Sequence, residues 1–339
     1  MPALRPRPAV SGVPTVSGVP GSGADDGARA GAPGPAGGAN AGGAATPGPA
    51  VGSPERWARR AGVTARRLRP PGAGEPTLVL LAGAGLGSAF WEPVLGLLPG
   101  THVVVDRQGR LGTHCHGLPA LHTQAGILAR LLEDLGVADG APTVLVAHSM
   151  AAFEAELLAR RRPGLVDGIV LVDPSVAHQP RLTPLLAVGA VRGRAPLAAL
   201  GLAATRGLLK VPGTHRVVAA LARASMRGMV TRPQALDSPA WQDTWTVSSL
   251  TGGAAESLAY SAQQADLLRS RALADGPVRV PTLLLQAPPY ASRGRLASAR
   301  RAFSRLVVRE VPDSGHFMTI DAPQEVARAV REVMAMLDT

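Results

Sequence analysis

The sequence contains little cysteine, lysine or aromatic residue, and these shortages narrow the classes of protein it can belong to. Its single cysteine, Cys115, cannot form a disulfide within the chain, which argues against a disulfide-stapled secreted fold. The amino terminus shows no continuous apolar segment followed by a cleavage site, and so gives no sign of a secretory signal. From these two absences we expect a cytoplasmic protein.

Long uncharged apolar runs are also absent. The most apolar stretch, Leu182 to Leu209, is interrupted by Arg192, Arg194 and Arg206, and falls short of the ~20 apolar residues that span a bilayer. We therefore expect no stable membrane insertion. A chain of 339 residues is long enough for one large domain or two small ones.

The formal charge of +11 is concentrated in one internal segment. Residues 175–250 hold nine cations against Asp237 and Asp243, a balance of +7, whereas the charges of residues 1–55 cancel. Such a segment favours an anionic substrate, a membrane surface or a nucleic acid, although a codon bias toward arginine accounts for it equally well. No aromatic residues interleave with these charges as base stacking would require, so we expect no nucleic-acid partner.

Residues 1–55 are mainly Gly, Pro, Ala and Ser, which cannot bury enough apolar surface to offset the entropy of folding. We predict a disordered tail there. From residue 56 onward, buried strand patterns alternate with helical patterns, which is typical of an α/β fold. The predicted strands are 63–69 (an edge strand), 77–82, 101–105, 143–147, 166–173, 278–286 and 306–311, and the predicted helices are 123–135, 153–162, 254–273, 294–303 and 324–337.

The stretch around Ser149 is the most informative part of the chain. The apolar, β-branched run from Thr143 to Ala147 predicts a buried strand, and a helical pattern begins at Phe153. Few residues remain for the reversal, so Ser149 is predicted to lie on a sharp strand-to-helix turn. Such a turn raises the hydroxyl above the sheet edge and directs the next amide, that of Met150, toward the same space. A structural alternative is a small residue required by close packing of the strand against the helix.

A glycine-rich loop after the strand 77–82 supports two interpretations. Gly83-x-Gly85-x-x-Ser88, with Asp106 at the end of the next strand, is close to a dinucleotide-binding fingerprint and suggests an oxidoreductase. However, a cofactor-binding helix starting at the second glycine would contain Pro93 in its interior, which costs roughly 3 kcal/mol. A helix starting near Phe90 places Pro93 in its first turn, where proline is tolerated.

Three motifs resemble those of the α/β-hydrolase family. The family's G-x-S-x-G is present as Ala147-His-Ser149-Met-Ala151, its Asp-Arg-Pro-Gly-x-Gly loop as Asp106-Arg-Gln-Gly-Arg-Leu-Gly112, and its catalytic-histidine loop as Ser314-Gly-His316 followed by Asp-Ala-Pro. The resemblance implies a mostly parallel central sheet flanked by helices, built from residues 56–174 and 253–339. It further implies a helical cap over residues 175–252, where we expect helices at 184–191, 197–209 and 217–229. It makes Asp106 and Arg107 structural residues.

The same resemblance implies a catalytic triad of Ser149 as nucleophile, His316 as base and Asp173 as acid. A serine hydroxyl needs an adjacent base, and that base needs a carboxylate to fix its tautomer. The family's usual acid position, after the strand 278–286, holds Ala287-Pro-Pro, so Asp173 at the end of the preceding strand is preferred; Asp275, Asp313 or no acid at all stay open. The implied oxyanion hole consists of the Met150 and Ala84 backbone amides, while His148 is expected to line the pocket or pack.

These residues predict an esterase-like serine hydrolase that acts on a small acyl substrate and needs no cofactor. A serine at the elbow argues against relatives that use an Asp nucleophile, namely dehalogenases and epoxide hydrolases. An acyltransferase and a non-catalytic binding protein of the same fold stay open, as does the oxidoreductase. His114, Cys115, His116 and His122 lack a second cluster at ligand spacing, so we expect a polar loop there and no metal site.

Overall fold

A computed structural model describes residues 56–60, 63–68, 75–107, 117–137, 141–178 and 195–337. The predicted tail, the loop 108–112, the cluster His114, Cys115 and His116, and the predicted helix 184–191 all lie outside these residues. Of the predicted domains, the tail therefore stays a prediction.

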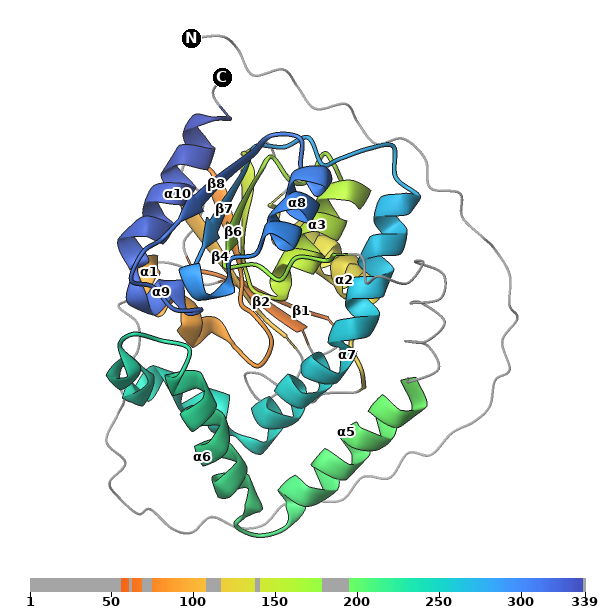
Figure 1. Cartoon of the computed structure of the whole chain (residues 1–339), viewed down its shortest axis with the longest axis vertical. Coiled ribbons are helices and arrows are strands. Elements are labelled where there is room, and N and C mark those ends of the chain that lie inside the picture. Colours follow the sequence, from red (N-terminus) through yellow and green to blue (C-terminus); the bar gives the residue numbers. More distant parts are fainter. Residues whose placement is uncertain are drawn as a thin grey trace, which may run out of the picture. The chain divides into compact units, whose positions relative to one another are not determined.

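The described chain is organised around one eight-stranded sheet with the order β1-β2-β4-β3-β5-β6-β7-β8 (Figure 1). β2 pairs antiparallel with both β1 and β4, and all other neighbouring strands are parallel, as the predicted α/β fold requires. The strands are β1 (Arg56–Arg60), β2 (Val63–Arg67), β3 (Thr77–Leu81), β4 (Thr101–Asp106), β5 (Thr143–His148), β6 (Gly168–Val172), β7 (Thr282–Gln286) and β8 (Leu306–Glu310).

One strand was predicted at the wrong position in the sheet. The strand at 63–69, β2, was expected at the edge of the sheet, but β1 covers it and takes the edge position. β1 has the sequence Arg-Trp-Ala-Arg-Arg, which shows no alternation of apolar and polar residues and therefore gives no strand signal.

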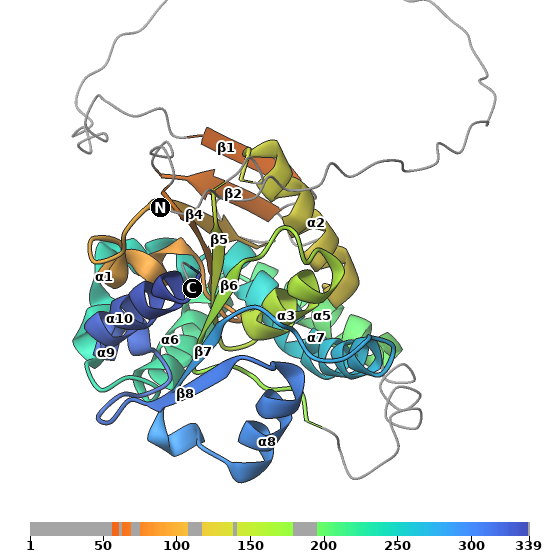
Figure 2. The same cartoon turned by 90° about the horizontal axis from the view of Figure 1, so that it is seen from above.

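Helices cover both faces of the sheet (Figure 2). In β3, Leu78 and Leu80 pack into the apolar cluster that includes α10, while Val79 and Leu81 pack into the cluster that includes α2 and α3. Both faces are buried, which is why these strands appear in the sequence as continuous apolar runs. The flanking helices are α1 (Glu92–Leu95), α2 (Leu121–Asp134), α3 (Ala151–Arg161), α8 (Arg293–Ala302), α9 (Met318–Asp321) and α10 (Pro323–Ala335).

Of the chain between β6 and β7, the described residues from 195 onward are mostly helical (Figure 1). The helices expected at 197–209 and 217–229 are α5 (Ala195–Lys210) and α6 (Thr214–Arg227), followed by the 3-10 helices η2 (Pro233–Asp237) and η3 (Pro239–Trp245). The next helix, α7 (Val247–Ala272), starts before the predicted one and runs through the expected end of the cap at residue 252. None of the described helices has the length and apolarity needed to cross a membrane.

Candidate active site

The loops after β3 and β5 lie next to each other because these two strands are neighbours. The chain passes from β3 to β4 on one side and returns to β5 on the other, so the order of strands reverses at this point. In open α/β sheets, such a reversal is where ligands bind, beyond the carboxyl ends of the strands.

Ser149 lies on the sharp turn between β5 and α3, as predicted. Its φ is 52°, in the left-handed region, where a residue with a side chain costs about 1–2 kcal/mol. The turn is held from both sides: the Ser149 N–H donates to the Val172 carbonyl at 3.2 Å, and the Ser149 carbonyl accepts from the Ser175 N–H at 2.9 Å. These bonds offset the strain and fix the hydroxyl at the sheet edge.

The close contact that restricts side-chain size at the Ser149 turn is made by Gly83, on the loop after β3. Ala147 and Ala151, which replace the family's two glycines, are both fully buried in the apolar core. Gly83, by contrast, lies against the turn: a Cβ atom there would lie 2.8 Å from His148 Nδ1 and 2.9 Å from Ser149 Cβ. The constraint on side-chain size therefore falls on Gly83.

The structure brings Ser149, His316 and Asp173 together, although they are far apart in the sequence. The distance from His316 Nε2 to Ser149 Oγ is 3.0 Å, and the distance from His316 Nδ1 to Asp173 Oδ2 is 2.5 Å. The imidazole thus has a hydroxyl on one nitrogen and a carboxylate on the other. With Nδ1–H donating to Asp173, the unprotonated Nε2 can accept the serine proton.

Asp173 lies beside the position at which the family's usual acid is expected. It follows β6 with a φ of 38°, its side chain is buried, and its Oδ1 accepts the Ala287 N–H at 3.1 Å. Ala287 follows β7, which is the position that the sequence leaves without a carboxylate. The two alternative acids, Asp275 and Asp313, are exposed.

His148, which the sequence predicts to line the pocket or pack, also contacts the histidine loop. It is fully buried, and its ring stacks on Phe90 with the centroids 4.2 Å apart. Burial, and then the neighbouring His316, hold the pKa of His148 well below its ordinary value, so the ring is neutral. The His148 Nε2–H donates to the His316 carbonyl oxygen at 3.0 Å. This bond fixes the backbone at His316, and with it the position of the His316 imidazole.

The histidine loop is also held by its own aspartate. Asp321 accepts the Gly315 N–H at 2.9 Å, the Thr231 N–H at 2.9 Å and the Thr231 hydroxyl at 2.6 Å. A Cβ atom at Gly315 would lie 2.3 Å from the Met229 carbonyl oxygen. Asp321 and Gly315, both part of the motif read from the sequence, therefore clamp the loop to the segment that follows α6.

The loop after β3 contains Ala84, the second predicted oxyanion donor. Ala84 packs against the apolar cluster that includes Met150, so the two predicted donors lie on adjacent segments. The N–H of the next residue, Gly85, is already used, since it donates to Glu256 Oε2 at 2.7 Å. The role of the Ala84 amide as oxyanion donor stays a prediction from the family resemblance.

A buried ionic network also holds the loop after β3. Arg107 donates to the Ala82 carbonyl and pairs with Glu154 at 2.9 Å and with Glu256 at 3.6 Å. Burial by itself lowers the pKa of Arg107, but the two carboxylates outweigh it and raise this pKa above its ordinary value. The structural role expected of Arg107 is therefore to hold the loop after β3. No feature of the sequence predicted that Glu256, on α7, takes part in this network.

The contact between the glycine-rich loop and Asp106 argues against the dinucleotide interpretation. The Asp106 carboxylate accepts the Ser88 N–H at 2.7 Å, at the start of η1 (Ser88–Trp91). Pro93 falls in the first turn of α1, which is the later helix start. The carboxylate that would bind a ribose is therefore bonded to the protein's own loop.

Among the described residues, no group of three or more His, Cys, Asp and Glu side chains could hold a metal ion. His122 lies on α2, and its Nε2 is 3.5 Å from the Ser270 hydroxyl. Because the other three members of the predicted polar loop fall outside the described residues, the expectation of no metal there stays a prediction.

Comparisons with known proteins agree with this architecture. The family model described as "Alpha/beta hydrolase family" matches residues 78–329, so the chain belongs to the α/β-hydrolase family. The resemblance read from the sequence and the predicted fold are confirmed.

Two kinds of relative extend the comparison. Over 105 residues the chain is 33% identical to a Klebsiella pneumoniae (strain 342) protein described as "Putative carbamate hydrolase RutD"; the match covers 30% of this chain and only 39% of that protein. Among solved structures, Cfl2 from Burkholderia cenocepacia is similar with a TM-score of 0.60 and 22% identity, covering 82% of this chain and 94% of that one. A Pseudomonas aeruginosa protein described as "a putative epoxide hydrolase" has a TM-score of 0.60 and 19% identity, covering 85% and 97%. At these identities the solved structures show the fold alone.

Proposed function

We propose that the protein is a serine hydrolase that cleaves an ester or related acyl bond of a small hydrophobic substrate. The observation that carries this proposal is the chain of contacts from the Ser149 hydroxyl through the His316 imidazole to the Asp173 carboxylate, at 3.0 and 2.5 Å. A hydroxyl, an imidazole and a buried carboxylate in this order form the constellation that makes serine nucleophilic at neutral pH.

The reaction proceeds in two steps. Ser149 Oγ attacks the substrate carbonyl carbon while His316 Nε2 accepts its proton, and Asp173 stabilises the resulting imidazolium. The negative charge on the carbonyl oxygen is stabilised by the Met150 and Ala84 amides, each worth roughly 10²–10³ in rate. The imidazolium then protonates the leaving group, which departs and leaves an acyl-serine. Water, deprotonated by His316, hydrolyses this intermediate and releases the acid.

The carbonyl chemistry of this site suits esters and carbamates alike, since both form a tetrahedral intermediate with an oxyanion. The name of the Klebsiella relative favours including carbamates among the first substrates to test. We also propose that α5, α6, η2 and η3 cap this site, because the segment following α6 bonds directly to the histidine loop.

A fluorophosphonate probe, which labels only an activated serine, tests the proposal. We expect labelling of the wild-type protein, none of Ser149→Ala, and unchanged labelling of Ser257→Ala, an exposed serine on α7. Hydrolysis of 4-nitrophenyl esters should fall by about 10⁶ in Ser149→Ala.

Far-ultraviolet circular dichroism establishes that each variant is folded. Folded wild-type protein that neither takes the label nor cleaves esters or carbamates would instead favour a non-catalytic binding protein of this fold.

A further inference from the structure

The basic segment noted in the sequence is more one-sided than its net charge suggests. From residue 174 to 236 the chain has nine cations and no Asp or Glu. Three of these cations, Arg216, Arg223 and Arg227, recur on α6 at spacings that place them on one side of a helix. No residue of α6 is fully buried, so this helix presents a cationic side that the core does not use.

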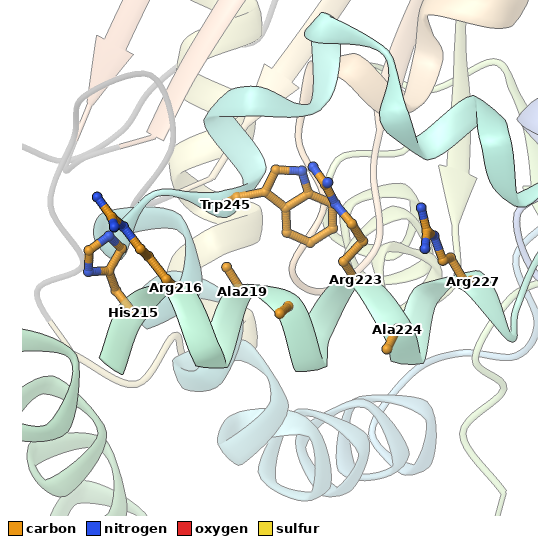
Figure 3. A pocket seen from close by; sticks show the side chains of 8 residues that line it. His215, Arg216, Ala219, Arg223, Ala224, Arg227 and Trp245 are labelled. Carbon is orange, nitrogen blue, oxygen red and sulfur yellow. The ribbon is translucent and has the colours of Figure 1, made fainter. Parts of the chain in front are cut away.

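That side of α6 lines a cavity of about 490 Å³. Figure 3 shows the three arginines leaving the same side of the helix, with the Trp245 ring of η3 beside Arg223. The guanidinium carbon of Arg223 lies 4.9 Å from the centre of that ring. Ala219, Ala220 and Ala224 form part of the remaining wall.

The charges of this cavity are only partly neutralised. Asp237 accepts from Arg227 at 2.9 Å and lies 3.8 Å from Arg223, so one carboxylate serves two guanidinium groups. Arg216 makes no ion pair with any carboxylate in the described part of the chain. The cavity thus keeps excess positive charge, while Trp245 and three alanines give it an apolar wall. Guanidinium groups bind carboxylate and phosphate through paired hydrogen bonds, and an indole face binds an apolar or aromatic body.

The cavity shares an element with the candidate active site. Trp245 ends η3, and Trp241 on the same short helix stacks on Phe317, with centroids 6.4 Å apart and an interplanar angle of 4°. Phe317 follows His316 directly in the chain. An occupant of the cavity therefore contacts the element that packs against the histidine loop.

We propose that this cavity binds the anionic end of the substrate, a carboxylate or phosphate attached to an apolar or aromatic body. The assignment of that occupant as substrate rests on the proposed hydrolase function, whereas anion binding by the cavity does not. Binding energy from such a remote group serves to position the reacting bond.

Binding is measured first, by isothermal titration calorimetry on Ser149→Ala protein, which cannot turn substrate over. Benzoate and phenyl phosphate are the anionic probes, and benzamide and phenol are their neutral counterparts. We expect the anions to bind more tightly, and Arg216→Gln or Arg223→Gln to weaken them by about tenfold each. Lys210→Gln, which removes a cation of the same segment from outside the cavity, should leave binding unchanged. Equal binding of the charged and neutral probes, or equal losses in the lysine control, overturns the site.

Turnover is measured second, with 4-nitrophenyl hemiglutarate against 4-nitrophenyl pentanoate. We expect a higher kcat/KM for the anionic ester in the wild-type protein and loss of that preference in Arg216→Gln and Arg223→Gln, through KM. Anion binding without any such preference overturns the substrate assignment. Failure of the hydrolase function leaves a different signature, since fluorophosphonate labelling is then absent while the calorimetric result is unaffected.

Discussion

Acid should destabilise this protein through His148, a residue that takes no part in the proposed chemistry. Burial, and then the nearby His316, lower the pKa of His148 well below 6.5, while in the unfolded chain it returns to about 6.5. Below that pH the unfolded chain takes up a proton that the folded protein excludes. The contribution of His148 to the free energy of unfolding is therefore constant above the unfolded pKa and decreases as the pH falls below it, by up to about 1.4 kcal/mol per pH unit.

The magnitude follows from the same linkage. Between pH 7.5 and 5.0, a single histidine that stays neutral in the folded protein removes about 2 kcal/mol of stability. Urea denaturation at half-unit pH steps, followed by tryptophan fluorescence, gives the wild-type curve. The reference is His148→Gln, whose amide does not titrate and can still donate to the His316 carbonyl.

The comparison depends on the slopes alone. His148→Gln lowers the absolute stability, but that offset is the same at every pH, and the lowered pKa of His122 contributes equally to both proteins. We expect the two curves to converge toward pH 5.0, by up to about 2 kcal/mol. Parallel curves would mean that the folded protein protonates this imidazole as readily as the unfolded chain does, and the neutral ring inferred here would be refuted.

Two further predictions concern the loop after β3. Gly83→Ala places a methyl 2.8 Å from His148 Nδ1 and 2.9 Å from Ser149 Cβ. Ester hydrolysis should therefore fall at least about a hundredfold, and the free energy of unfolding by about 1–3 kcal/mol. The control Gly126→Ala, within α2 and with open space around it, should be neutral or stabilising by up to about 1 kcal/mol. Full activity of Gly83→Ala would refute the close approach. Glu256→Gln keeps an acceptor for the loop amide but removes one charge from Arg107, so we expect a loss of about 1–3 kcal/mol and a lower kcat, whereas Glu332→Gln, in a partly exposed pair with Arg309, should cost less than about 1 kcal/mol. Equal losses in the two glutamate variants, by urea denaturation, would count against the network.

The elements that sequence analysis predicted well are those with a local signal. Continuous apolar runs marked the parallel strands because both faces of the sheet are covered, and the short segment around Ser149 left room only for a tight turn. The pairing of Asp173 with His316 was also within reach, since a strand end supplied a carboxylate where the next strand supplied none.

Residues whose partners are remote were beyond this reasoning. Glu256 binds the Gly85 amide across 171 positions, and His148 binds the His316 carbonyl across 168. Neither contact can be predicted from the residues that are near it in the sequence. A glutamate in a helix suggests a solvated face, and a histidine at a strand end suggests packing. β1 was missed for a related reason, because its partner strand determines its structure and its own side chains show no period.

The remote contacts have a common origin that bears on how the site is built. Ser149 and His316 sit on loops of the core, yet the chain between β6 and β7 bonds to the loops on both sides of them. Glu256 of α7 accepts from the loop after β3, and Thr231, after α6, donates to Asp321 behind the histidine. Both bonds hold the backbone of these loops, so shifting the inserted helices away would release the proposed oxyanion donor and the imidazole together. The inserted region is therefore part of the geometry of the site, and a variant that deletes it should lose fluorophosphonate labelling even where the sheet still folds.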